Sequence, residues 1–163
     1  MIRLFLAALC CAALGLITRQ FLVLDGLVSI WQPEAGLALA LLLLGGPRYA
    51  WAVLGGFALS STVSFGLTLQ ALALALGCSA GPVLGAWLLR RDAAFNVRLA
   101  RLNDYLRLMA WGAGLGSLAS ALLGTALLVL EDLWLGAAPG LLVQWWMGSA
   151  LGVMLVTPLE LAW

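Results

Sequence analysis

The feature that most constrains this chain is a series of long apolar runs, separated only by short connections. Hydrophobic residues make up 64% of the chain and charged residues 9%, whereas a typical soluble domain has about 45–50% and about 25%. Such a chain has too few polar side chains to cover a water-facing surface, and a helix that crosses a membrane needs about 20 mostly apolar residues. The runs also lack the polar–apolar alternation of a membrane β-barrel. The sequence therefore predicts an all-α, polytopic integral membrane helix bundle in a lipid bilayer.

Six stretches have the composition expected of membrane-spanning helices. They cover residues 3–24, 27–46, 48–66, 69–89, 103–130 and 139–161. The second stretch is broken near Pro33, because proline has no backbone N–H to donate inside a helix. We therefore expect about six transmembrane helices, which form a single domain over residues 1–163.

The connection between the fourth and fifth stretches predicts the orientation of the bundle. Arg90, Arg91, Arg98 and Arg101 lie in or next to this connection, with Asp92 as the opposing charge. Short connections rich in arginine remain on the cytoplasmic side of a membrane. With six crossings, this orientation places both the N-terminus and the C-terminus in the cytoplasm.

The composition argues against enzymatic, metal-binding and nucleic-acid-binding functions. The chain has no histidine, which removes the commonest metal ligand and the usual general base. Cys10, Cys11 and Cys78 lie inside apolar runs, at spacings that fit no metal or redox site. The eight basic residues form no patch large enough for nucleic acid. We therefore expect no catalytic residues, no metal and no cofactor.

Small residues repeat every four positions in several of the predicted spans. In the fourth span they are Gly77, Gly81 and Gly85, and in the fifth span Gly112, Gly116, Ser120 and Gly124. This spacing places small side chains on one helix face, so that two backbones can approach closely. The partner helices could belong to the same chain, to a second copy in a homodimer, or to other membrane subunits.

The sequence around Pro33 predicts a helix that is too short to cross the membrane. Proline is favoured in the first turn of a helix, so we expect the helix of the second span to begin at Pro33. From Pro33 to Gly46 there are 14 residues, or about 21 Å of helix, against about 30 Å of hydrocarbon. Residues 26–32 should therefore enter the membrane in an irregular conformation, which requires a cover of protein or a water-filled cavity.

Glu34 follows this proline and is the main candidate for a functional group. An ionisable residue inside a span indicates a functional site and needs a partner, for which Arg19 in the first span is the best candidate. The alternative is a carboxylate at the outer interface that stabilises the helix N-terminus and contacts water. Under the first interpretation an outward-facing cavity would bind a ligand, and Thr157-Pro158 would be a hinge in the sixth span. The predicted ligand-binding residues are Arg19, Trp31, Glu34, Gln144, Trp145 and Ser149.

Three segments of the chain resemble the MASE1 domain, a bacterial integral-membrane sensory domain. They are "WQPEAGLALALLLLGG" (31–46), "GAWLLRR" (85–91) and "WWMGSALGVMLVTPLELAW" (145–163). The chain departs from the family pattern at Gln32 or Glu34, where a second proline is usual, and at Ser149, where aspartate is usual. The resemblance implies a multi-helix input module in the bacterial cytoplasmic (inner) membrane, placed upstream of histidine kinase, PAS or cyclic-di-GMP domains.

Two hypotheses about function follow. The first is a non-enzymatic sensory input module whose stimulus is unknown. The second is an accessory or structural subunit of a larger membrane complex, which docks through small-residue helix faces and tryptophans. A native gene that continues into a cytoplasmic signalling domain would exclude the second. A complete chain that purifies at fixed stoichiometry with other subunits would exclude the first.

Overall fold

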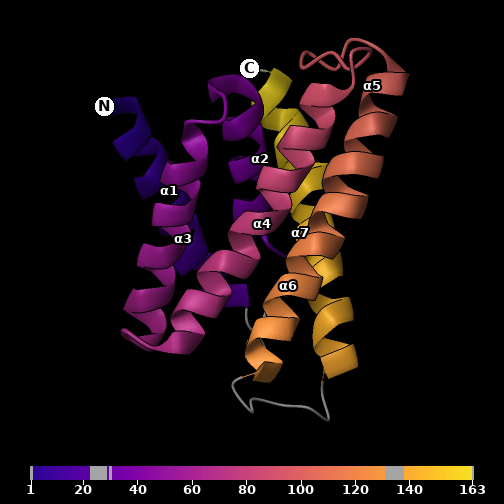
Figure 1. The fold of residues 1–163 in the computed structure, drawn as a ribbon. Helices are drawn as coiled ribbons and strands as arrows, with labels where there is room; N and C mark the ends of the chain where they lie inside the picture. The colour runs from indigo at the N-terminus through magenta and orange to yellow at the C-terminus, as the bar shows by residue number, and fades with distance from the viewer. Residues whose placement is uncertain (1, 23–28, 30, 131–137, 163) are drawn as a thin grey trace.

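The computed structural model describes residues 2–22, 29, 31–130 and 138–162, and over these residues the chain is a helix bundle without strands (Figure 1). The elements are α1 Ile2–Leu22, α2 Pro33–Gly45, α3 Tyr49–Phe65, α4 Leu69–Arg91, α5 Leu102–Arg107, η1 Leu108–Gly116, α6 Ser117–Leu130 and α7 Ala138–Ala162. Because α5, η1 and α6 follow one another directly, they form a single long span. The predicted all-α bundle is therefore confirmed, and its spans lie where the apolar stretches predicted them.

Four spans are long and apolar enough to cross a membrane. They are Ile2–Gln20, Leu69–Arg91, Leu102–Leu130 and Ala138–Ala162. The remaining two apolar helices, α2 and α3, have 13 and 17 residues. The chain is therefore a multi-pass membrane protein.

Both termini lie at the same end of the bundle as the connection that precedes α5 (Figure 1). The turn between α3 and α4 lies at the opposite end. This arrangement agrees with the prediction that the termini and the arginine-containing connection share one side of the membrane. We call this side the arginine end; its arginines are Arg3, Arg48, Arg90, Arg91, Arg98, Arg101 and Arg107.

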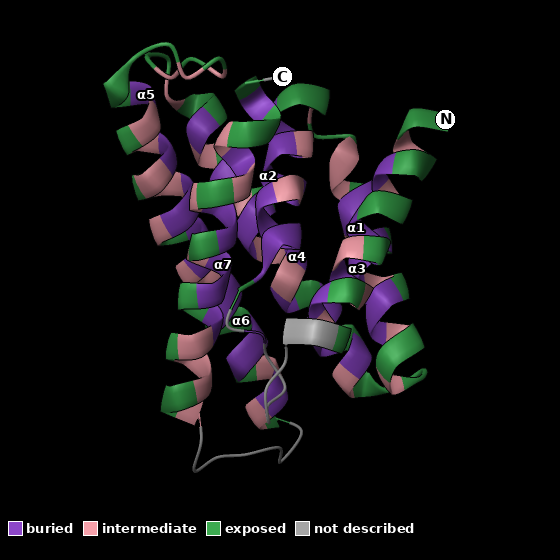
Figure 2. Cartoon of the chain, turned by 180° about the vertical axis from the view of Figure 1, so that it is seen from behind, coloured by how far each residue is buried: buried purple, intermediate pink, exposed green. Residues whose placement is uncertain are grey.

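The short helix α2 lies in the centre of the bundle, where it is mostly buried (Figure 2). At its N-terminal end, the backbone N–H of Gln32 donates a hydrogen bond to the carbonyl oxygen of Gly148 in α7 (3.1 Å). At its C-terminal end, Nη2 of Arg90 in α4 donates to the carbonyl oxygens of Leu42 and Leu43 (3.0 Å each). Helix ends leave backbone groups without partners in the helix, so these contacts stabilise a helix that ends inside the bundle.

The small-residue repeats of α4 face those of η1 and α6. A Cβ atom added at Gly77 would lie 2.7 Å from the Cα atom of Gly124, and one at Gly81 would lie 2.8 Å from the carbonyl oxygen of Gly116. The hydroxyl of Ser120 donates to the carbonyl oxygen of Gly77 (2.5 Å). These two repeats therefore pack helices of the same chain against each other, as one of the alternatives predicted.

The fifth span differs from the continuous α-helix that the sequence predicted. Its nine residues Leu108–Gly116 form a π-helix, a conformation that is rare and usually limited to one turn. Gly112 and Gly116 lie in this segment, and the added Cβ of Gly85 would be 3.2 Å from the Cα atom of Gly112. Glycine has no side chain to resist a change in winding, so this part of the span adjusts to the close contact with α4.

Candidate functional site

The described residues just before α2, which are Ser29, Trp31 and Gln32, are non-helical and form hydrogen bonds. The hydroxyl of Ser29 donates to the carbonyl oxygen of Trp31 (2.7 Å), and the hydroxyl of Ser149 donates to Oε1 of Gln32 (2.6 Å). Pro33 is the first residue of the helix, as predicted. Irregular backbone at this depth needs protein around it, and Gln32, which is 5% exposed, shows that α7 provides this cover.

The N-terminal end of α2 lies beside the middle of α7. Its contacts on α7, Gly148 and Ser149, lie near the middle of the helix Ala138–Ala162. The 13 residues of α2 span only about 20 Å, measured from the arginine end. This length agrees with the prediction of a helix too short to cross about 30 Å of hydrocarbon, and the expected position of Glu34, near the outer interface or in a shallow outward-facing cavity, stays a prediction.

Glu34 is a buried carboxylate whose partner is a hydroxyl. Its side chain lies in the first turn of α2 and is 6% exposed. Oε2 accepts a hydrogen bond from Oγ1 of Thr18 in α1 (2.7 Å), and Thr18 is itself 1% exposed. The carboxylate therefore joins α1 to α2 inside the bundle, at a helix end whose dipole favours negative charge.

The predicted ion pair between Arg19 and Glu34 is not formed in the described structure. Nη2 of Arg19 instead donates to Oγ of Ser61 in α3 (2.9 Å), and its guanidinium lies 5.3 Å from the ring centroid of Phe65. Thr18 and Arg19 are consecutive on α1, so their side chains point about 100° apart around the helix axis. Thr18 therefore faces α2, while Arg19 faces α3.

Arg19 retains one buried nitrogen, Nη1, without a hydrogen-bond partner among the described residues. A buried polar group without a partner carries a free-energy cost of about 1–3 kcal/mol. The contact with Phe65 offsets part of this cost through attraction between the cation and the ring. Arg19 therefore links α1 to α3.

Trp145 lies one helical turn before Ser149 on α7 and has a packing role. Its side chain is fully buried (0% exposed) and lies against Gly77 of α4 and Gly124 of α6. Nε1 of its indole is buried without a hydrogen-bond partner in the part of the chain that the structure describes. Glycines on two helices therefore leave the room that this large ring fills.

The structure does not bring Gln144 to the other predicted site residues. Gln144 lines an open, mostly apolar groove of about 550 Å³ along the outer face of α7. Five positions separate it from Ser149, which places the two side chains about 140° apart around the helix. Trp31 is 38% exposed. The predicted set thus divides into a buried cluster around α2 and residues that lie away from it.

Sequence reasoning missed two residues of the buried cluster, Thr18 and Gln32. The signal for Thr18 was a polar residue inside the apolar run of residues 3–24. A polar residue on an otherwise buried helix face needs a partner inside the protein. For Gln32, the signal was its position beside Pro33, at a predicted helix end within the membrane.

These observations define a polytopic membrane domain with a buried polar cluster, centred on a short helix that ends inside the bundle. The model of the MASE1 family matches residues 1–163, which is the whole chain. The chain therefore belongs to the MASE1 family, a family of membrane-associated sensor domains. Searches of curated proteins and of solved structures found no match.

Proposed function

We propose that residues 1–163 act as one sensory input domain whose stimulus acts at the buried cluster around Glu34 and is transmitted by α7. The observation that carries this proposal is the position of α2. This helix contacts α1 through Glu34 and Thr18, and contacts α7 through Gln32 and Ser149. A change at the carboxylate would therefore reach α7 through a single short helix.

The coupling between α2 and α7 rests on contacts of the backbone. Flexible side chains therefore cannot easily compensate for a displacement of one helix. The backbone N–H of Gln32 donates to Gly148, and Oγ1 of Thr157 donates to the carbonyl oxygen of Gly36 (2.9 Å). An added Cβ at Gly36 would overlap the carbonyl oxygen of Gly152. Because backbone lies directly against backbone, a displacement of α2 would require a displacement of α7.

The C-terminal part of α7 supports a role in transmission. The helix continues through Pro158 to Ala162, and proline cannot donate to the carbonyl four residues earlier. That carbonyl belongs to Met154, and the hydroxyl of Tyr105 lies 3.5 Å from its oxygen. This long contact is at the limit of a hydrogen bond, so the segment around Pro158 is a natural place for α7 to bend.

A test of this proposal compares the movement of α7 with that of α3. In a background without the native cysteines, a fluorescent probe at Leu159→Cys reports on α7 and a probe at Val63→Cys reports on α3; both positions are more than 60% exposed. We expect Glu34→Gln to shift the emission of the α7 probe, and Ser149→Ala to reduce that shift by half or more. Equal shifts of the two probes would indicate general loosening of the bundle and contradict the proposal.

We also propose that the arginine end faces the cytoplasm of a bacterial inner membrane. The support is the concentration of arginine at that end, together with the tendency of such connections to remain inside. In the same cysteine-free background, we expect Ala94→Cys to react with a membrane-impermeant maleimide only after the membrane is opened. Thr68→Cys, at the other end and exposed, should react in intact cells. The reverse pattern would invert the orientation.

The second candidate, an accessory or structural subunit, remains a separate proposal. The repeats around Gly77 and Gly116 are occupied by helices of this chain, so docking would use other faces. Gly55 and Gly140 have no neighbouring atoms within 4 Å of an added Cβ. Native mass spectrometry from membranes, with a fixed stoichiometry to other subunits or to a second copy, would support this function over the sensory one.

A further inference from the structure

An open pocket lies in the connection between α4 and α5, at the arginine end. Its volume is about 760 Å³ and its lining is half polar. The lining residues are Ala93, Ala94, Phe95, Asn96, Val97, Arg98, Ala100, Arg101 and Asp104. This pocket lies outside the buried cluster around Glu34, and the proposed sensory function does not use it.

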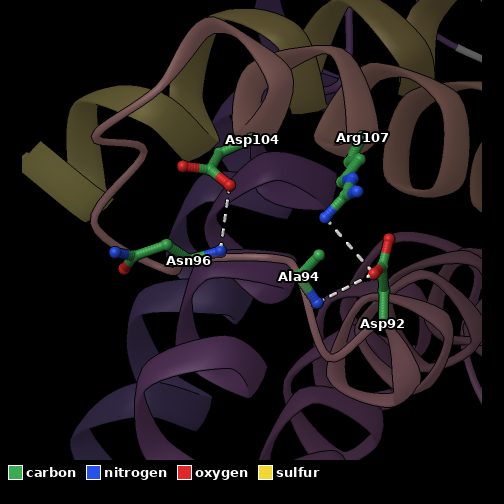
Figure 3. A network of polar contacts seen from close by, with 5 residues as sticks. All are labelled: Asp92, Ala94, Asn96, Asp104 and Arg107. Atoms are coloured by element: carbon green, nitrogen blue, oxygen red, sulfur yellow. Dashed lines mark hydrogen bonds and ion pairs between the residues drawn. The ribbon is translucent and has the colours of Figure 1, made fainter.

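Two carboxylates fix the shape of this pocket (Figure 3). Asp104 is 2% exposed, and its two oxygens accept from the backbone N–H groups of Asn96 and Arg101 (3.1 Å each). Oδ1 of Asp92 accepts from the backbone N–H of Ala94 (3.1 Å) and lies 3.3 Å from Nη1 of Arg107. The connection is therefore held in one conformation by side chains at both of its ends.

Apolar side chains hold the middle of the same connection against the bundle. Phe95, Val97 and Leu99 are partly buried and pack against the main hydrophobic core. Leu99 has a φ of 49°, a left-handed conformation that costs a residue with a side chain about 1–2 kcal/mol. Packing of this residue against the core offsets that cost, and the polar side chains between these anchors remain at the surface.

The lining of the pocket has a net positive charge, because it contains two arginines, Arg98 and Arg101, and one carboxylate, Asp104. Asp104 is engaged by backbone groups and Asp92 by Arg107. Arg98 and Arg101 are exposed and form no ion pair with any described residue. Guanidinium groups bind phosphate oxygens through paired, charge-assisted hydrogen bonds, so the lining fits a phosphate group.

The helix α5, which begins directly after Arg101, has two exposed apolar side chains. Leu102 is 74% exposed and Leu106 is 51% exposed, and four positions separate them, so they lie on one face of the helix. On the α4 side, the guanidinium of Arg91 lies 3.9 Å from the ring centroid of Trp87, which is 48% exposed. Arginine and tryptophan together are typical of the level of the lipid headgroups.

We infer that this pocket binds the headgroup of an anionic phospholipid, with Arg98 and Arg101 on the phosphate and Leu102 and Leu106 along the acyl chains. A soluble phosphate would use the two guanidinium groups alone. A phospholipid uses the two arginines together with the exposed apolar side chains of α5, and a membrane presents a headgroup and acyl chains together. Arginines near a membrane surface attract anionic lipids in this way.

Binding of lipid to the purified chain of residues 1–163 in detergent tests this inference. The probes are dioleoyl-phosphatidylglycerol and dioleoyl-phosphatidylcholine, and native mass spectrometry counts the bound molecules. We expect the double variant Arg98→Gln/Arg101→Gln to lower the affinity for phosphatidylglycerol by roughly ten-fold or more, with no change for phosphatidylcholine. Arg48→Gln, an exposed arginine at the same end but outside the pocket, is the matched control and should retain the wild-type affinity.

Two further measurements separate the lipid from other sources of the same chemistry. Leu102→Gln should weaken binding of phosphatidylglycerol without changing the weak binding of inorganic phosphate. Inorganic phosphate should displace the lipid only at far higher concentration. An equal loss in Arg48→Gln would indicate a general charge effect, and equal affinity for lipid and inorganic phosphate would indicate a free-anion site; either result overturns the inference. Circular dichroism of each variant verifies that the helices are retained.

Discussion

Gly152→Ala should lower the free energy of unfolding by about 3 kcal/mol, the upper part of the usual range for overpacking. The added methyl group would overlap the carbonyl oxygen of Gln32. This oxygen belongs to the backbone at the start of α2, so rotation of a side chain cannot relieve the overlap. The substitution should also weaken the hydrogen bond between Gln32 and Gly148, because α2 has to move away from α7.

Gly55→Ala is the matched control for this prediction. Gly55 lies in α3, it is exposed, and an added Cβ meets no atom within 4 Å. Alanine is favoured over glycine in a helix by up to about 1 kcal/mol, so this variant should be as stable as the wild type or slightly more so. Unfolding in mixed micelles of increasing SDS content, followed by tryptophan fluorescence, measures both variants. Equal destabilisation would mean that the contact between α2 and α7 is not close.

The helix bundle could be predicted because the strongest signals in the sequence are local. They reflect the requirement that a chain in lipid be apolar and helical. Long apolar runs have few alternatives to helices in a membrane, so the bounds of α4 and α7 follow from composition alone. The start of α2 at Pro33 follows from the geometry of one residue. The shared side of the termini follows from the number of crossings and agrees with the position of the Arg90–Arg101 connection.

The details of the site depend on information that a single sequence does not contain. Whether Thr18 or Arg19 faces Glu34 is decided by the rotation of α1 about its axis, and one residue changes that direction by about 100°. The apolar character of α1 is nearly even around the helix, so periodicity does not fix this rotation. The depth of Glu34 likewise depends on which part of α7 faces Gln32, and this is set by glycines on both helices. Long-range packing decides both.

The π-helical segment of the fifth span escaped prediction for a related reason. Gly112 and Gly116 indicated a packing surface in the sequence, but the sequence did not show that the helix winds as a π-helix there. The carbonyl oxygen of Gly114 accepts from Nε1 of Trp146 in α7 (3.2 Å), and the backbone of Gly112 lies against Gly85 in α4. The π-helical segment therefore contacts two other helices at once. These long-range contacts are not visible in any local sequence pattern.

Thr18→Val should lower the free energy of unfolding by about 2 kcal/mol, because it removes the hydroxyl that binds a buried carboxylate. Valine has nearly the same shape as threonine, so packing is retained. Thr62→Val is the matched control, since the hydroxyl of Thr62 donates to the carbonyl oxygen of Leu59 in its own helix (3.0 Å) at a partly exposed position. Its effect should remain within about 0.5 kcal/mol.

A double-mutant cycle identifies the partner of Glu34 directly. Thr18→Val and Glu34→Gln should show an interaction energy of about 1–2 kcal/mol, because the two side chains are in contact. The cycle of Arg19→Gln with Glu34→Gln should give a smaller value, since the guanidinium binds Ser61 rather than the carboxylate. A larger energy for the arginine cycle would restore the ion pair that the sequence predicted. The rotation of α1, and with it the link from α1 through Glu34 to α7, would then have to be reassigned.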